Sequence, residues 1–278
     1  MAPPRQSGVA LVTGSSSGIG RAVADRLAAS GWSVHGGSRR GAGPAPTPDG
    51  RPTWSPLALD VTSDASVAEV VARVLEADEG IDALVHCAGI SVAGAIEDVT
   101  IAEAQQQLAT NYFGSIRLVQ AVLPAMRRRG RGRVIIVGSI GGLIGLPFIG
   151  HYSASKFALD GMVQALRIEI RPFGLEATIV HPGDIQTDIS ANQIEGEETG
   201  PKSPYHERFK ATVAAYDKAV SAAPGPDVVA AAIARLLARR RLPPRVIVGT
   251  ASERAGVGLK ALLPPRLFEI IIRKTYRL

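Results

Sequence analysis

Val9-Ala10-Leu11-Val12 runs directly into Thr13-Gly14-Ser15-Ser16-Ser17-Gly18-Ile19-Gly20, and this stretch decides the fold. Its first four residues form a short apolar run, as in a buried strand. One helical stripe then carries the apolar residues Ile19, Val23, Leu27 and Ala28. The glycines therefore lie between a strand and a helix, which is the context of a dinucleotide-binding turn. The alternative is a serine- and glycine-rich loop that binds nothing.

Each glycine of this turn has a separate expected role. Gly14 allows the tight turn, Gly18 lets the backbone approach a pyrophosphate, and Gly20 lets the helix pack closely on the strand. The pyrophosphate would then meet the positive end of the helix. The spacing is G-x-x-x-G-x-G, not the commoner G-x-G-x-x-G.

Apolar runs and helical patterns alternate along the rest of the chain. We expect strands at 9–13, 32–37, 55–59, 82–86, 133–138, 176–181 and 245–249. Helices are expected near 18–30, 63–78, 101–129, 151–171 and 225–240. This alternation predicts an α/β fold with a single doubly wound domain of Rossmann type, in which a parallel seven-stranded sheet carries helices on both faces.

The composition suits one folded domain. The chain has 278 residues, 46% of them hydrophobic, and a net charge of +6, which suits an anionic ligand without requiring one. Its single cysteine, Cys87, excludes an internal disulfide and fits a reducing compartment. Met1–Gly8 lacks the apolar segment of a signal peptide, so we expect a cytoplasmic protein.

A second motif indicates a catalytic site: Tyr152-Ser153-Ala154-Ser155-Lys156. Residues four apart share one face of a helix, so the ammonium of Lys156 can lie near the phenol of Tyr152. A nearby positive charge lowers the pKa of a tyrosine from its usual value of about 10, which suits a general acid or base. Such pairs also occur on ordinary solvated helices, so this pair indicates catalysis only in combination with other motifs of the chain.

The two motifs together, T-G-x-x-x-G-x-G and Y-x-x-x-K, resemble those of the short-chain dehydrogenase/reductase superfamily. Other motifs match in the right order: Asp60-Val61, Cys87-Ala88-Gly89 where the family usually has Asn-Ala-Gly, Asn111, Ser139, and Pro182-Gly183 with Thr187. The resemblance covers about residues 8–190, and loosely extends to about 250. It implies a catalytic domain at 8–250, preceded by a disordered tail at 1–7 and followed by an extension at 251–278.

The resemblance also implies roles for the matched residues. Tyr152 would exchange a proton with the substrate oxygen, Ser139 would hydrogen-bond that oxygen, and Lys156 would lower the pKa of the tyrosine and bind the nicotinamide ribose. Asn111 would hold a water linked to Lys156. The cofactor would contact Gly14, Ser16, Ser17, Gly18, Ile19, Gly20, Ser38, Arg39, Arg40, Asp60, Val61, Cys87, Ala88, Gly89, Asn111, Tyr152, Lys156, Pro182, Gly183, Ile185 and Thr187.

The choice of cofactor depends on the segment after the second strand. Sites that prefer NAD place an acid there, but no acid occurs between Leu27 and Asp49. Arg39 or Arg40 can instead pair with a 2′-phosphate, so NADP (as NADPH) is favoured over NAD. The alternative is that both arginines are solvated loop charges.

The expected substrate is a small hydrophobic ketone or secondary alcohol, steroid-, retinoid- or polyketide-like. The apolar loop Leu143–Pro147 and the similarity around Tyr152 to steroid and retinol dehydrogenases both favour it. A non-catalytic NADP(H)-binding sensor or scaffold on the same fold is the alternative. The resemblance implies a homodimer or homotetramer. No metal-ligand spacing is present, and the five arginines within 127–133 fit a helix end better than a nucleic-acid site.

Two further segments have open roles. Residues 184–224 are polar and without periodicity, which predicts a long loop, and the resemblance implies a lid over the substrate. Residues 254–278 combine six basic side chains with an apolar cluster at 267–272. They would close over the pocket or pack in a subunit interface; the alternative is peripheral contact with a membrane surface.

Overall fold

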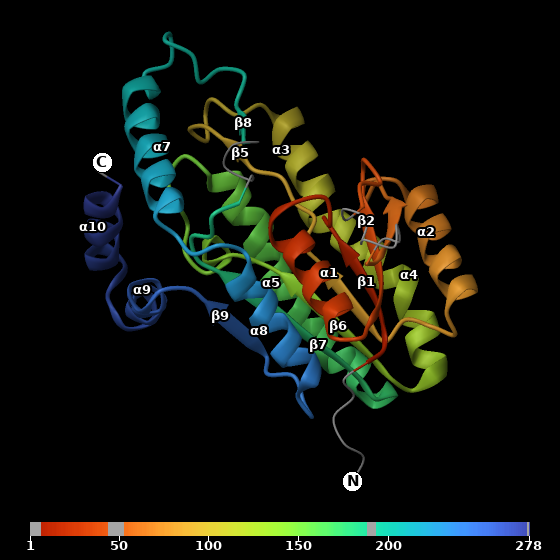
Figure 1. Ribbon diagram of the computed structural model, residues 1–278. Coiled ribbons are helices and arrows are strands. Elements are labelled where there is room, and N and C mark those ends of the chain that lie inside the picture. The colour runs from red at the N-terminus through yellow and green to blue at the C-terminus, as the bar shows by residue number, and fades with distance from the viewer. Residues whose placement is uncertain (1–6, 44–52, 188–192, 277) are drawn as a thin grey trace.

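Seven parallel strands form one sheet in the order β3-β2-β1-β4-β6-β7-β9 (Figure 1). In this computed structural model, residues 7–43, 53–187, 193–276 and 278 are described. The strands are β1 (Val9–Thr13), β2 (Ser33–Ser38), β3 (Ser55–Ala58), β4 (Ala83–His86), β6 (Gly132–Val137), β7 (Leu175–Pro182) and β9 (Arg245–Val248). The predicted doubly wound parallel sheet is therefore confirmed. Residues 1–6 of the expected tail, Asp49, and residues 188–192 of the expected lid lie outside the described residues.

Helices cover both faces of the sheet (Figure 1). They are α1 (Gly18–Ala29), α2 (Asp64–Ala77), α3 (Ile101–Leu108), α4 (Gly114–Arg129), α5 (Gly150–Ile170), α7 (His206–Ser221), α8 (Asp227–Ala238), α9 (Ala251–Leu262) and α10 (Pro265–Thr275). Successive strand residues point to opposite faces. Leu11 accordingly packs in a core with α2, α4 and α5, whereas Ala10 and Val12 pack in a second core with α1 and α8.

The strand order reverses between β1 and β4. From β1 the chain moves outward to β3 and then returns to β4 on the other side of β1. Ligands of open α/β sheets bind beyond the carboxyl ends of the strands at such a reversal. The glycine turn after β1 and the residues after β4 and β6 meet at this edge, so the fold brings the predicted site residues together.

The helix expected at 101–129 is interrupted. A π-helical turn at Ala109–Phe113 separates α3 from α4. Such turns insert one extra residue in a helix and often mark functional positions. This one carries Asn111, which is fully buried.

The expectation of a long loop at 184–224 is wrong. Within the described part, β8 (Ile194–Glu195) pairs with β5 (Val92–Ala93), and α7 forms a helix of 16 residues. The buried face of α7 is narrow, with only Phe209 and Thr212 buried, so the rest of its sequence reads as polar. Phe209 makes an edge-to-face contact with Phe148, with ring centroids 5.9 Å apart.

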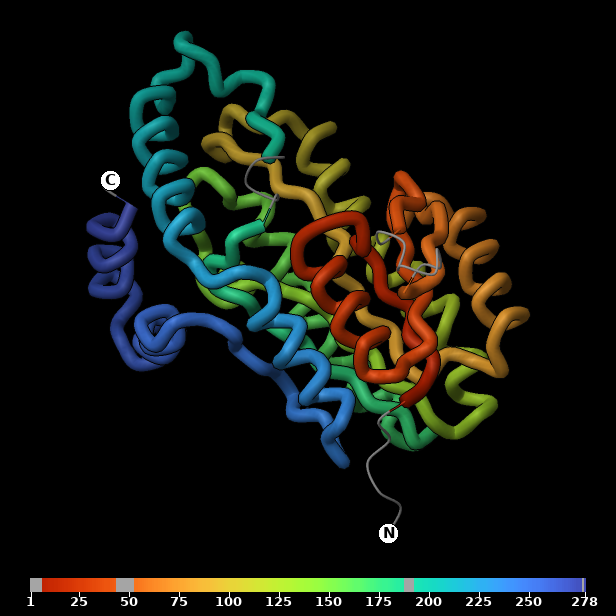
Figure 2. The backbone as a smooth tube through the Cα atoms, viewed as in Figure 1, coloured from red at the N-terminus to blue at the C-terminus, as the bar shows by residue number. Residues whose placement is uncertain are grey.

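The C-terminal extension forms two further helices, α9 and α10. The backbone trace shows them beside α7 (Figure 2), where the rings of Tyr216 and Tyr276 lie 4.7 Å apart. None of the helices in the described parts of the chain is long and apolar enough to cross a membrane.

Candidate active site

The glycine turn has the geometry that its sequence predicts. Gly14 and Gly18 have φ angles of 69° and 55°, in the left-handed region that favours glycine. A Cβ atom on Gly20 would meet the carbonyl oxygen of Gly14 well inside van der Waals contact. Side chains at these positions are therefore excluded, and the backbone of the turn stays open at the start of α1.

The turn fits a dinucleotide. The first turn of α1 contains no acid, and Ser17 makes no side-chain capping bond, so its N–H groups are available to an anion. The hydroxyls of Ser15 and Ser38 are buried and have no hydrogen-bond partner among the described residues. Buried hydroxyls without a partner are costly, and a polar ligand in the crevice would satisfy them.

Ser139 and Tyr152 meet at the carboxyl end of β6. Ser139 follows that strand, and its Oγ accepts a hydrogen bond of 3.0 Å from Gly141 N. Tyr152 comes from the first turn of α5 and is hydrogen-bonded to the Ser139 side chain. Burial raises the pKa of Tyr152, and the bond with Ser139 offsets part of that effect. Tyr152 is therefore a protonated phenol at neutral pH, which is the form that a general acid needs.

Lys156 does not lower the pKa of Tyr152 as expected. Its Nζ donates a hydrogen bond of 3.1 Å to the carbonyl oxygen of Val137, and it lies 5.6 Å from the centre of the Tyr152 ring. The ammonium is thus directed at the end of β6 rather than at the phenolic oxygen. Burial lowers the pKa of Lys156 itself to about 8.

Asn111 holds the loop after β4. Its Oδ1 accepts from Ile90 N at 2.8 Å, and its Nδ2 donates to Ile90 O and to Ser155 Oγ, both at 3.0 Å. A Cβ atom on Gly89 would lie 3.3 Å from Asn111 Oδ1 and 3.7 Å from Lys156 Nζ. Asn111, Gly89 and Lys156 therefore line one small space, and the expected role of Asn111 in holding a water there stays a prediction.

The comparisons with known proteins agree with this geometry. The pattern of one family, short chain dehydrogenase, matches residues 8–198. The chain belongs to this family. It is 35% identical over 272 residues to "3-ketodihydrosphingosine reductase" of Bacteroides thetaiotaomicron, and the match covers 98% of each chain. It is 38% identical over 191 residues to human "17-beta-hydroxysteroid dehydrogenase type 1", covering 64% of this chain and 57% of that one.

Solved structures give the same fold. A short-chain dehydrogenase from Streptomyces avermitilis has a TM-score of 0.77 at 32% identity, covering 97% of this chain and 99% of that one. A member from Burkholderia phymatum in complex with NAD has a TM-score of 0.79 at 22% identity, covering 94% and 95%. This short chain dehydrogenase is thus an oxidoreductase that acts on CH–OH or C=O groups.

Cys87 stands where the short chain dehydrogenase family usually has asparagine. Burial raises the pKa of its thiol to about 12, so the thiol is neutral and adds no charge beside Lys156. The backbone N–H groups of Cys87 and Ala88 lie 3.2 and 3.3 Å from Thr13 Oγ1, which binds the ring of His86 at 2.8 Å. Thr13 therefore joins the ends of β1 and β4 under the glycine turn.

The residues expected to select the cofactor lie at the ends of β2 and β3. Arg39 and Arg40 follow Ser38 and are exposed. Asp60 accepts hydrogen bonds of 2.9 and 2.7 Å from the backbone and hydroxyl of Thr62. These bonds lower the pKa of Asp60, and the charge of Arg39 contributes. Arg39 is thus near Asp60, beyond the end of β3.

The expected residues after β7 also face the glycine turn. A Cβ atom on Gly18 would lie 3.3 Å from the side chain of Thr187, and Ile185 is buried in the core under α1. Glu253 of α9 accepts a hydrogen bond of 2.5 Å from Asp184 N. A Cβ atom on Gly183 would collide with the same carboxylate, so the Pro182-Gly183 turn is packed directly under α9.

The sequence reasoning missed His181 and Asp160. His181 precedes Pro182 on β7 and is fully buried, and its ring nitrogens contact the Ser139 carbonyl and the Asp160 carboxylate. Burial lowers the pKa of His181, and the hydrogen bonds to both partners oppose that effect. The sequence signal for this contact was a histidine in an otherwise apolar strand, directly before the Pro182-Gly183 motif. Asp160 shows no metal-ligand spacing, and in the structure its carboxylate is a hydrogen-bond partner of His181.

Proposed function

We propose that this short chain dehydrogenase is an NADPH-dependent reductase of a hydrophobic ketone, also able to oxidise the matching secondary alcohol. The observation that carries the proposal is the convergence of Ser139, Tyr152 and Lys156 beyond the end of β6, beside the open glycine turn. Arg39 and Arg40, with no acid in the described segment 39–43 directly after β2, support NADPH over NADH.

The residues of this chain have separate tasks in that reaction. When bound, the nicotinamide supplies or accepts the hydride. The Ser139 hydroxyl would hold the substrate oxygen, and Tyr152 would give it the phenolic proton as negative charge develops. Lys156 would bind the ribose. The raised pKa of Tyr152 keeps its proton in place before reduction.

Apolar walls support a hydrophobic substrate. Leu143 and Ile144 follow the turn that carries Ser139 and are buried, and Phe148 contacts Phe209 of α7. Two helices cover this loop: Tyr216 of α7 donates a hydrogen bond of 3.2 Å to Pro147 O, and Lys260 of α9 donates to Leu143 O. We infer that residues 193–224 and the extension from 251 form a lid over the substrate.

The relative from Bacteroides thetaiotaomicron favours one class of ketone substrate. Its name specifies a 3-keto long-chain base, and its match extends through the C-terminal extension. The human hydroxysteroid dehydrogenase matches only part of this chain. We therefore rank a long-chain ketone of the sphingoid type above a steroid, retinoid or polyketide ketone. We also propose that the protein is a homodimer or homotetramer in the cytoplasm. The exposed side chains of Phe113 and Phe157 offer apolar surface for contact between subunits.

The test combines a substrate panel with one substitution. Long-chain 3-keto amines, steroid ketones and retinal would be offered with NADPH and NADH, and nicotinamide absorbance followed. Tyr152→Phe should lower turnover about 100- to 10,000-fold and keep NADPH affinity, because only the phenolic proton is lost. Tyr112→Phe is the matched control. Retention of more than about a tenth of the turnover would exclude Tyr152 as the acid. No turnover of any ketone, with NADPH bound normally, would favour the non-catalytic sensor.

A further inference from the structure

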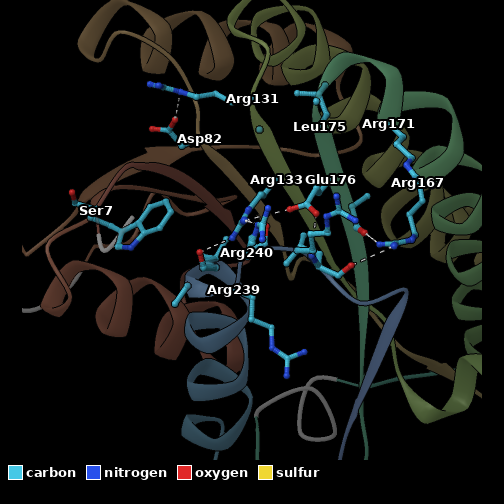
Figure 3. Close-up of a pocket in the computed structure, with 18 of the residues that line it drawn as sticks. Ser7, Asp82, Arg131, Arg133, Arg167, Arg171, Leu175, Glu176, Arg239 and Arg240 are labelled. Atoms are coloured by element: carbon cyan, nitrogen blue, oxygen red, sulfur yellow. Dashed lines mark hydrogen bonds and ion pairs between the residues drawn. The ribbon is translucent and has the colours of Figure 1, made fainter. Parts of the chain in front are cut away.

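A second cleft lies at the amino edge of the sheet, opposite the edge that carries Ser139 (Figure 3). Its volume is about 1070 Å³, and it lies among the starts of β4, β6 and β7 and the ends of α5 and α8. Six steps along the chain, through β6 and just beyond it, separate Arg133 on the rim of the cleft from Ser139. At about 3.3 Å per residue the two sites are roughly 20 Å apart. The cleft is therefore no part of the active site.

Positive charge dominates this amino-edge cleft. Seven of its lining residues are arginines and only two, Asp82 and Glu176, are acids. The arginines are Arg131, Arg133, Arg167, Arg171, Arg239, Arg240 and Arg241. Its floor is apolar, with Leu175, Ala177, Leu237 and Leu242 all buried. Like charges in one concave site repel, so this arrangement gains stability from a bound anion.

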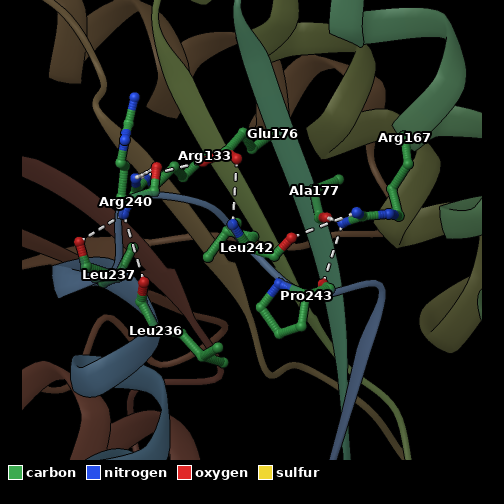
Figure 4. Close-up of polar contacts among 9 residues, drawn as sticks. All are labelled: Arg133, Arg167, Glu176, Ala177, Leu236, Leu237, Arg240, Leu242 and Pro243. Carbon is green, nitrogen blue, oxygen red and sulfur yellow. Dashed lines mark hydrogen bonds and ion pairs between the residues drawn. The ribbon is translucent and has the colours of Figure 1, made fainter.

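Three of the arginines already have partners (Figure 3 and Figure 4). Arg133 donates to Leu237 O at 2.7 Å and pairs with Glu176 at 3.3 Å. Arg167 donates to Ala177 O and to Pro243 O. Arg131 pairs with Asp82 at 3.2 Å. These contacts connect β6, β7 and the segment after α8, so the shape of the cleft is fixed before any ligand binds.

The other four arginines have no such partner. Among the described residues, no carboxylate or carbonyl oxygen contacts the side chains of Arg171, Arg239, Arg240 or Arg241. The two acids of the cleft are occupied, because Arg129 and Arg131 both face Asp82, while Glu176 binds Arg133 and Leu242 N. The positive excess therefore sits on the exposed side of the cleft.

Helix capping does not explain the three arginines at 239–241. Basic residues are favoured at helix C-termini because they compensate the last carbonyl groups. At the end of α8 that task falls to Arg133, which binds Leu236 O and Leu237 O. Arg239, Arg240 and Arg241 follow the last residue of α8. The backbone N–H of Arg239 binds Leu236 O, but among the described residues none of the three side chains binds a carbonyl of this helix.

We propose that the amino-edge cleft binds a small polyanion that carries two or more linked phosphate groups. Guanidinium groups recognise phosphate oxygens through paired hydrogen bonds. The volume is at the upper end of ligand pockets, which is more than a single phosphate fills. The concave shape and the apolar floor suit a compact ligand that enters the cleft and contacts several of these arginines together.

The probe is inorganic tripolyphosphate, titrated into the whole protein in 0.15 M salt. Binding would be followed by calorimetry and by tryptophan fluorescence, because Trp32 lines the cleft and the other tryptophan, Trp54, is buried elsewhere. The test variant is Arg239→Ala/Arg240→Ala/Arg241→Ala. The matched control removes three exposed arginines outside the cleft, Arg73→Ala/Arg254→Ala/Arg266→Ala, and lowers the net charge equally. ATP in place of tripolyphosphate tests whether a nucleoside improves the fit.

Saturable binding to the wild type, weakened at least about tenfold in the test variant and less than about twofold in the control, is the expected result. The dinucleotide should not displace the probe, since the glycine turn that would bind it lies at the opposite edge of the sheet. Equal weakening in both variants would reduce the effect to net charge and overturn the proposal. So would displacement by the dinucleotide, absence of binding, or tighter binding to duplex DNA or anionic vesicles than to tripolyphosphate and ATP.

Discussion

His181 Nε2 lies 3.0 Å from Asp160 Oδ1, and the other nitrogen of the same ring, Nδ1, lies 2.8 Å from the carbonyl oxygen of Ser139. A carbonyl oxygen only accepts, so Nδ1 carries a proton and donates it to Ser139. Asp160 is itself held by Gln164, at 2.6 Å, and faces Arg245 at 3.5 Å. A buried polar chain therefore supports the backbone of the serine that faces Tyr152.

His181→Ala should lower kcat by about tenfold or more and leave the KM for the dinucleotide within about twofold. The substitution removes one of the two hydrogen bonds to the Ser139 carbonyl, of which the other comes from Gly142 N, and it removes the partner of Asp160 Oδ1. Loss of a typical hydrogen bond costs about 0.5–1.5 kcal/mol, and the Ser139 backbone is then held less firmly. The measurement is steady-state kinetics with thermal unfolding. Asp160→Asn, which keeps a hydrogen-bonding side chain opposite Nε2, should lose less. A purely structural role would instead lower the melting temperature with kcat per folded molecule unchanged.

The pH dependence of reduction should follow Lys156. Burial lowers the pKa of this lysine to about 8, so its charge is present below that pH and lost above it. If the ammonium supports proton transfer, kcat/KM for ketone reduction stays level below about pH 8 and falls about tenfold per pH unit above it. Lys156→Arg keeps its charge over this range. A decline at the same pH in that variant would assign the titration to another group.

Arg39→Ala should weaken NADPH binding about 10- to 150-fold and change NADH binding little. A charge-assisted hydrogen bond to the 2′-phosphate is worth roughly 1.5–3 kcal/mol, and NADH lacks that phosphate. Arg39→Asp should go further, since the new acid repels the phosphate and accepts from the ribose hydroxyl. The measurement is the ratio of kcat/KM for the two cofactors, with Arg40→Ala as the neighbouring control. A wild-type ratio below one, or a ratio that neither position changes, would make NAD the cofactor.

Lys260→Met should raise the KM for an apolar ketone about two- to tenfold with kcat and NADPH affinity little changed. Lys260 joins α9 to the loop before Tyr152 through Leu143 O, and to α5 through a cation–π contact of 4.8 Å with Phe157. Lys274→Met, an exposed position on α10, should have no effect. Removal of residues 254–278 should lower turnover of soluble ketones. If truncation spares turnover and abolishes binding to anionic vesicles, the extension is a membrane contact instead.

The sequence by itself determined the α/β alternation and the glycine turn. An apolar run followed by glycines and a helical stripe leaves few alternatives, because each signal is local and arises from backbone sterics or side-chain period. Tyr152 and Lys156 could be paired for the same reason, since four residues on one helix define their spacing. The segment at 184–224 was misread because α7 buries only Phe209 and Thr212 along its length.

Only the tertiary structure decided contacts between residues far apart in the chain. Parallel strands place Arg133 and Glu176 side by side at one edge and Ser139 and His181 at the other, although more than 40 residues separate the members of each pair. Burial then set the charges: it raised the pKa of Tyr152 and lowered that of Lys156, a balance that composition cannot predict. Desolvation depends on how the whole chain packs around a group, and no local pattern of residues encodes it.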